Sequence, residues 1–379
     1  MIVMQTKALL LDAYRDLNAR KLFWVVLAIN VVVIAAFATL GVSGNRITIL
    51  GWRIPQEIPL AQFFYKWIFR YVIVGRWLTW AATIMALIST ASIFPDFMAG
   101  GAIDLYLSKP IGRLRLFLTK YIAGLLFVLL QVTVFTIGGF FVLGLRGSTW
   151  EPGIFLAIPI VLLFFSYLFS ICVLMGVMTR STLTSFFLTL VAWFLIFAVN
   201  QTDSFLMRAE ELYQERTAQA EQQIISLDQR IADMQKPVGQ VSPATQPTTG
   251  SFLSWLVPDP SQAQQLAGLR ADRARAEETA REDEPPAWVK SAQPIVFALN
   301  TVVPKTGDTI GLLDRVLFTD AALKLAAAGY VPHAPMHGWR GDMQRLLNGR
   351  SIWWILGSSI CFEIVVLSLA AWKFCKRDY

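Results

Sequence analysis

The sequence predicts an all-α integral membrane protein with six transmembrane helices, an N-terminal interfacial helix, and a helical extracytoplasmic insertion between the fifth and sixth spans. Composition is the first reason: 55% of the 379 residues are hydrophobic, with 13 Trp and 26 Phe, and the mean hydropathy is +0.52. A soluble chain of this length needs far less apolar material to fill its core. The second reason is the recurrence of apolar runs of about the 20 residues that a membrane-spanning helix requires. The runs are 22–42, 71–93, 121–145, 154–178 and 352–372, with a shorter one at 183–199.

Residues 1–21 precede the first span and alternate basic with apolar side chains. Leu9, Leu10, Tyr14 and Leu17 have helical spacing, which favours a cytoplasmic helix lying in the membrane interface. A solvated leader is the alternative. The run that follows is too long for a signal peptide and has no persuasive cleavage site, so it is interpreted as a retained anchor.

The distribution of Lys and Arg near the span ends predicts both termini in the cytoplasm, in the plasma (inner) membrane. The outer loop between the third and fourth spans carries only Arg146, whereas the first outer loop is an exception with four basic residues. The basic residues of the inner loops and tail are Lys109, Arg113, Arg115, Lys120, Arg180, Lys373, Lys376 and Arg377.

The segment 200–351 lies outside the membrane in this topology and differs in charge from the rest. Its net charge is −3, whereas the remainder of the chain carries +10. The basic excess therefore belongs to the membrane part, where the positive-inside bias and anionic lipid account for it, and it does not indicate nucleic-acid binding. None of the three cysteines falls in the segment, so disulfides do not hold it together.

The insertion begins with a predicted helical hairpin. Helix 204–235 has a coiled-coil-like seam, a Pro- and Thr-rich linker follows at 236–251, and helix 260–282 can return antiparallel to the first or remain a solvated helix. The surface of 204–284 could bind an extracytoplasmic partner. Segments 294–303 and 308–328 are expected on the outer membrane surface or capping the bundle. The seam consists of Leu206, Tyr213, Ala220, Ile224, Leu227, Ile231 and Met234.

Motifs of catalysis are absent from the sequence. It has no GxxxxGK phosphate loop, no HExxH and no GxSxG, so no catalytic residue is assigned and no cofactor is expected on this chain. His333 and His337 are the only histidines, and Pro335 between them together with the lack of a completing ligand argues against a metal site. Energy for any active process must then come from another chain.

The inner loop 94–120, FPDFMAGGAIDLYLSKPIGRLRLFLTK, carries the most specific pattern in the sequence. Its glycines permit a sharp exit from the membrane, and its proline suits the first turn of a helix. The stretch GAIDLYLSKPIGR resembles the loop G-T-x-E-x-L-L-S-K/R-P-I/V-x-R of ABC transporter permeases of the type-2 exporter class. Ala102 stands where threonine is common, and the acidic residue before the glycines is Asp96. The matching residues are Gly101, Asp104, Leu107, Ser108, Lys109, Pro110 and Arg113.

This resemblance implies that the loop forms a coupling helix that docks on a separate cytoplasmic ATPase, which binds ATP and Mg. The chain is then a permease subunit of an exporter, with no enzymatic activity of its own, and it pairs with a second permease chain, most simply as a homodimer. Three alternatives remain open: a loop that contacts only lipid, a mechanotransmission protein that acts on an external partner without transport, and an integral membrane enzyme.

Strongly polar side chains deep in predicted spans mark a second candidate site. Asn30, Gln131 and Glu363 are such residues, and an ionisable group at this depth usually faces the bundle interior, a cavity or a partner. Glu363 either bonds between helices for packing or lines a translocation path with the two amides.

Overall fold

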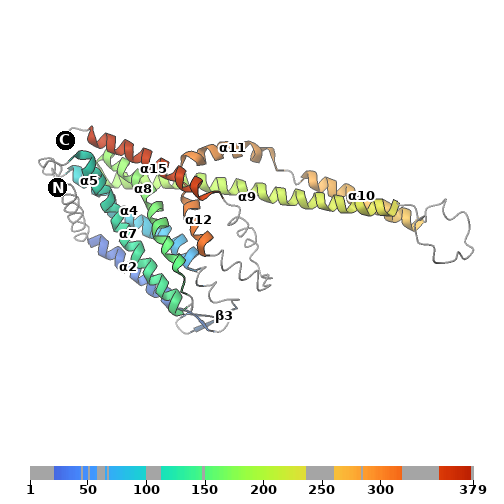
Figure 1. Ribbon diagram of the computed structural model, residues 1–379, viewed down its shortest axis with the longest axis horizontal. Coiled ribbons are helices and arrows are strands. Elements are labelled where there is room, and N and C mark those ends of the chain that lie inside the picture. The colour runs from blue at the N-terminus through green and yellow to red at the C-terminus, as the bar shows by residue number, and fades with distance from the viewer. Residues whose placement is uncertain are drawn as a thin grey trace, which may run out of the picture. The chain divides into compact units, whose positions relative to one another are not determined.

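The computed structural model describes the chain in segments and divides it into two compact units (Figure 1). One unit comprises Met1–Asn200 with Leu299–Tyr379, and the other comprises Gln201–Ala298. The described residues are 21–43, 46–49, 52–57, 65, 68–99, 112–146, 150–235, 260–282, 285–317 and 350–376.

Five helices among the described residues are long and apolar enough to cross a membrane. The first consists of η1 (Ile68–Ala82), α4 (Thr83–Thr90) and α5 (Ile93–Ala99), and it is followed by α7 (Arg113–Arg146). The others are η2 (Pro152–Leu156) with α8 (Ala157–Thr179), then α9 (Thr182–Gln235), then α15 (Ile352–Cys375). The chain is therefore a helical multi-pass membrane protein, as its sequence predicts.

The first predicted span, 22–42, is shorter than expected. Helix α2 covers Lys21–Thr39, and its apolar part, Phe23–Thr39, falls below the length of the five spans. The chain then enters an antiparallel sheet, β1 (Leu40–Ser43), β2 (Arg46–Ile49) and β3 (Trp52–Glu57).

The small sheet corrects the prediction of a purely helical fold. Strands β1 and β2 pair from Leu40 opposite Ile49 to Ser43 opposite Arg46. The sequence of this segment, LGVSGNRITILGWRIPQE, is rich in β-branched residues and punctuated by glycine, which favours short strands and turns over a helix. The hydroxyl of the buried Tyr65 donates to the Leu40 carbonyl at 2.9 Å and ties the start of the sheet to the bundle.

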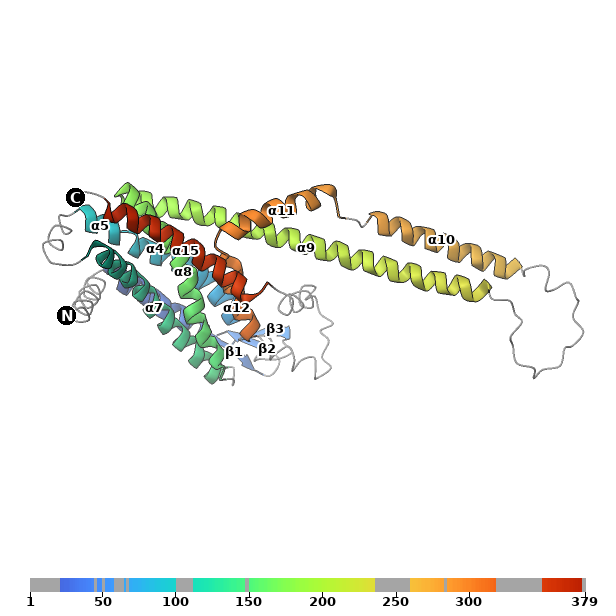
Figure 2. The same ribbon diagram turned by 45° about the horizontal axis from the view of Figure 1, so that its top comes forward.

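Helix α8 is the centre of the first unit. It packs against α7 and α15, which lie beside it in Figure 2, and against α12 (Thr306–Leu317). Most of its spanning part is buried, whereas most of the spanning parts of α9 and α15 face outward. At Gly124 of α7 an added Cβ would lie 2.5 Å from the Phe169 ring, so glycine permits the close approach of α7 to α8.

Apolar side chains also cover the outside of the bundle. On α7 they recur every four residues, which places them on one helix face and suits contact with lipid chains. This exposed row consists of Leu114, Leu118, Ile122, Leu126 and Leu130.

Helix α12 belongs to the bundle, although the sequence placed this region in the insertion. Leu313 and Leu317 are almost completely buried, and the helix packs on α8, α15, η1 and η2. Of the two expectations for the amphipathic segment 308–328, packing against the bundle therefore holds for its described part. The compact insertion unit ends at Ala298.

The second unit contains the predicted hairpin. Helix α9 continues to Gln235, and α10 (Pro260–Glu282) lies beside it in both views (Figures 1 and 2). Arg273 of α10 forms an ion pair with Asp228 of α9 at 2.5 Å. Helix α11 (Ala287–Val302) follows, and its Gln293 amide donates to Glu210 of α9.

Burial along the hairpin follows the predicted seam. Leu206 and Ala220 are buried, four further seam residues are half-buried, and only Met234 is exposed. On α10 the less exposed positions, Leu266, Leu269, Arg273, Ala276 and Ala280, have the same spacing of three and four.

Candidate functional site

The candidate coupling loop lies mostly outside the described residues, but both of its ends are described. Helix α5 ends at Ala99 and carries Asp96 on its exposed surface, and α7 begins at Arg113. The predicted loop 94–120 therefore includes the first turns of the long helix α7, which begins with the basic run from Arg113. The loop residues that fall outside the description are Gly101, Asp104, Leu107, Ser108, Lys109 and Pro110.

Arg113 has a structural contact that the sequence pattern does not indicate. Its Nη1 donates to the backbone carbonyl of Cys375 at 3.0 Å, which joins the first residue of α7 to the last residue of α15. A guanidinium at a helix C-terminus also interacts favourably with the helix dipole. Arg113 therefore fixes the geometry of this end of the bundle.

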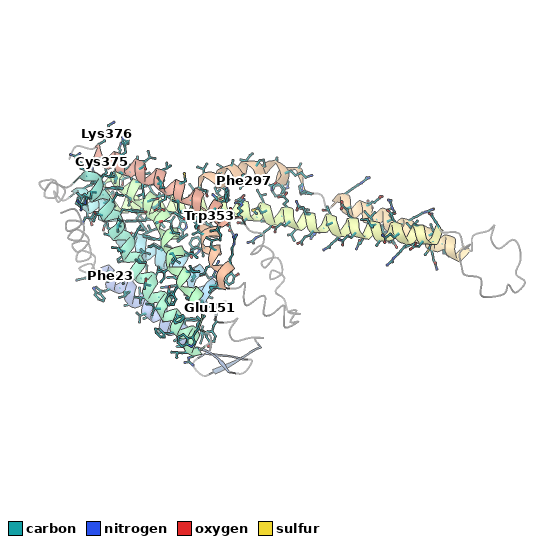
Figure 3. The ribbon with its side chains drawn as sticks, viewed as in Figure 1. Phe23, Glu151, Phe297, Trp353, Cys375 and Lys376 are labelled. Carbon is teal, nitrogen blue, oxygen red and sulfur yellow. The ribbon has the colours of Figure 1, made fainter. Side chains whose placement is uncertain are left out.

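Basic residues gather at one end of the bundle, although the other end also carries Arg146, the last residue of α7. Figure 3 places Cys375 and Lys376 at one end and Glu151, in the α7–α8 connection, at the other. Because α7 begins and α8 ends at the Cys375 end, Arg115 and Arg180 belong to it as well. Lys376 also lies over the Trp372 ring at 4.8 Å, the combination of cation and aromatic ring found at membrane interfaces.

Glu363 lies between three helices. The Tyr121 hydroxyl of α7 donates to Glu363 Oε1 at 2.7 Å, and the Ser166 hydroxyl of α8 donates to Oε2 at 2.9 Å. Glu363 shares a helix face with the buried residues Ser359 and Val366. No cation pairs with it in the part of the chain that the structure describes, so two hydroxyl groups compensate its carboxyl group.

Aromatic packing holds Tyr121, one of the two hydroxyl donors to Glu363, in place. The rings of Tyr121 and Phe169 stack with centroids 5.2 Å apart. The Tyr121 hydroxyl also lies 3.2 Å from the Ser166 carbonyl, so a second acceptor is available to it. Tyr121 and Ser166 were not predicted, because Tyr121 stands at the edge of an apolar run and the serines of α8 lie in an otherwise apolar helix without a recognisable motif.

The other two intramembrane polar residues lie apart from Glu363. Asn30 is fully buried and its Oδ1 accepts from Trp77 Nε1 at 3.0 Å. Gln131 is ten residues beyond Tyr121 on α7, about 15 Å along the helix axis. The Asn30 and Gln131 amide nitrogens have no hydrogen-bond partner among the described residues. The structure therefore does not bring Asn30, Gln131 and Glu363 together into one site.

A further polar cluster lies where the chain returns from the insertion, and no sequence pattern predicts it. Lys305 is fully buried, its Nζ donates to the Asn300 carbonyl at 3.0 Å, and the same atom lies 4.1 Å from the centroid of the Trp354 ring. Its backbone N–H donates to Ser359 Oγ at 2.9 Å, and the Ser359 hydroxyl itself donates to the Ile355 carbonyl at 2.8 Å, so Ser359 is not a donor to Glu363.

The described residues contain no group of three or more potential metal ligands, and His333 and His337 lie outside them. All three cysteines are free.

No protein-family model matches this sequence, and neither a curated protein nor a solved structure is similar to it. The residues and their geometry are therefore the basis for assigning a function.

Proposed function

We propose that this chain is the transmembrane permease subunit of an ATP-binding-cassette exporter, energised by a separate ATPase that docks on the loop between α5 and α7. The observation that carries the proposal is the stretch GAIDLYLSKPIGR in that loop. Helix α5 ends just before the loop and α7 begins just after it. Arg113, the first residue of α7, bonds to the C-terminal end of α15. In this arrangement the partner subunit binds ATP and Mg.

The basic end of the bundle is then cytoplasmic, in the plasma (inner) membrane. Helix α2, with 19 residues, is about 28 Å long, close to the roughly 30 Å of a bilayer core, and it serves as the sixth span. A second copy of the chain completes the membrane part of the exporter. The hairpin of α9 and α10 is a short coiled coil exposed outside the membrane.

The docking role is tested by reversing charge inside the motif. Asp104→Lys with Lys109→Glu leaves Arg113 in place, because that residue bonds to Cys375. We expect normal membrane insertion but loss of ATPase co-purification, or at least a tenfold loss of permease-stimulated ATP hydrolysis. Glu151→Lys, in the connection at the other end of the bundle, is the control and retains both. A double variant that still purifies with a fully active ATPase contradicts the docking role.

Mechanotransmission is the second candidate function, and the separate compactness of the insertion favours it. An insertion with its own ion pair and seam can be moved as a body by the spans that carry it. Reconstitution in liposomes separates the two functions. ATP turnover with changed cross-linking of the hairpin but without substrate flux indicates transmission, and flux indicates transport.

A further inference from the structure

A buried amide joins the two segments of the bundle between which the insertion stands in the sequence. Asn200 is buried, and its Nδ2 donates to the carbonyls of Ile196 at 2.9 Å and Pro304 at 3.1 Å, with Thr306 Oγ1 at 3.3 Å. The residue where the first unit leaves for the insertion therefore bonds to the start of α12, where the chain has returned.

Helix α12 is joined in turn to η1 by a buried ion pair. Helices η1, α4 and α5 together are called the second span below, because they follow α2. Arg70 Nη2 donates to Asp314 Oδ2 at 2.7 Å, and Arg70 Nε faces Asp314 Oδ1, so the contact is bidentate. The side chains of Arg70 and Asp314 are only 9% and 15% exposed. Arg70 was an exception to the predicted charge distribution, and its position opposite Asp314 explains why a cation is tolerated there.

The second span is shaped around this guanidinium. A Cβ added at Gly75 would lie 3.3 Å from Arg70 Nη1 and 3.2 Å from the Arg70 carbonyl, so glycine leaves the room that the side chain occupies. Residues Ile68–Ala82 form a π-helix, and the Thr79 hydroxyl bonds to the Val74 carbonyl, five residues back, at 2.7 Å. π-Helical geometry is rare, and where it occurs as single-turn bulges in α-helices it is frequently at functional sites.

Stability alone does not explain a buried ion pair, because apolar residues of the same volume usually stabilise a protein as well or better. Its better-attested effect is to fix one arrangement of the elements that it joins. Here those elements are α12 at the base of the insertion and the span that ends at Ala99, before the 100–111 loop.

We propose that the Arg70–Asp314 pair is a mechanical link between the base of the insertion and the second span, so that a displacement of either is transmitted to the other. The contiguous path runs from Asn200 through α12 and the ion pair into η1, α4 and α5. The link is a property of this chain alone and does not depend on any ATPase, so it stands or falls separately from the proposed function.

A coupling experiment on the purified full chain in detergent tests the link. Asn200→Ala loosens the base, and amide hydrogen exchange in 68–82 reports the response of the second span. We expect Asn200→Ala to raise that exchange about threefold or more in the native background. In the background Arg70→Gln with Asp314→Asn, which removes both charges and leaves no buried ion, the same substitution leaves exchange in 68–82 unchanged.

Two controls isolate the link from general loosening. Gln201→Ala changes an exposed neighbour of Asn200, and Arg76→Gln neutralises an exposed arginine of the same π-helix. Gln201→Ala is expected to leave amide exchange in 68–82 unchanged. In the background Arg76→Gln, Asn200→Ala is expected to raise that exchange as much as it does in the native background. An equal response to Asn200→Ala in both backgrounds, or no response in the native background, overturns the proposal.

Discussion

At the scale of single residues, the carboxyl group of Glu363 on α15 is bonded by hydroxyl groups from α7 and α8. Glu363 stands out as the carboxyl group in an apolar span, and its interior position follows from the cost of exposing it to lipid. Its donors, Tyr121 and Ser166, come from positions more than 190 residues away. Such pairings depend on how helices pack, and no local pattern encodes them. The geometry agrees best with the interpretation of Glu363 as an interhelical bond.

Glu363 substitutions should therefore separate hydrogen bonding from burial. Glu363→Gln retains an acceptor for one hydroxyl and should cost about 1 kcal/mol or less. Glu363→Leu leaves the Tyr121 hydroxyl only the Ser166 carbonyl and the Ser166 hydroxyl only the Leu163 carbonyl as acceptors, and it should cost about 1–2 kcal/mol. Thermal unfolding of the purified chain in detergent measures both. Ser368→Ala, on the exposed face of α15, is the control. Equal stabilities of the Gln and Leu variants would show that the hydrogen bonds contribute nothing.

Glycines of α7 and α15 should respond oppositely to alanine. Gly124→Ala places a methyl group against the Phe169 ring, so we expect a loss of about 1–3 kcal/mol in the free energy of unfolding. Gly357→Ala meets nothing within 4 Å on α15 and should stabilise the helix by about 0.5–1 kcal/mol. The same thermal-unfolding assay compares the two variants. A Gly124→Ala protein as stable as the native protein would contradict the close packing of α7 on α8.

At the scale of elements, long periodic or apolar stretches were predictable and short irregular ones were not. The bounds of α10 and the end of α9 agree with the sequence pattern, because Pro260 opens one helix and a Pro- and Thr-rich linker follows the other. The sheet at 40–57 was missed, since its first residues extend an apolar run that has the length of a span. The bundle position of α12 was missed because its ion pair with η1, Arg70–Asp314, joins residues 244 positions apart in the sequence.

The hairpin seam predicts which substitutions disrupt α10. Arg273→Ala removes the ion pairs with Asp228 and Glu277, whose partners are all more than a third exposed, and such surface pairs contribute little to stability. Ala276→Glu puts a carboxylate into the seam at a buried position and should separate the helices. Limited proteolysis of 260–282 reads out the difference, with Ala274→Glu on the exposed side as control. Rapid cleavage of the Arg273→Ala variant would instead make the ion pair the main contact.

At the scale of the whole molecule, the chain separates a membrane bundle from an insertion that is compact by itself. We predict that replacing 204–284 by a short flexible linker leaves the bundle folded, because Asn200 keeps its bonds to Pro304 and Thr306. Yield from membranes and thermal stability of the remaining chain measure this. A shortened chain that is absent from the membrane fraction would show that the insertion is needed for the bundle to fold.

Orientation is the property of the whole molecule on which the docking proposal depends most. The positive-inside bias predicts that Gly112, beside the loop, lies in the cytoplasm and that Glu151 lies outside. In a background with Cys172, Cys361 and Cys375 replaced, we expect a membrane-impermeant maleimide to label Glu151→Cys in intact cells. Gly112→Cys, an exposed position, should react only after the membrane is permeabilised. Ile137→Cys, in the lipid-facing part of α7, should stay unlabelled in both conditions. The reverse pattern would put the 100–111 loop outside the cell, where no ATP-driven subunit can reach it, and would exclude the permease function while leaving the Arg70–Asp314 link intact.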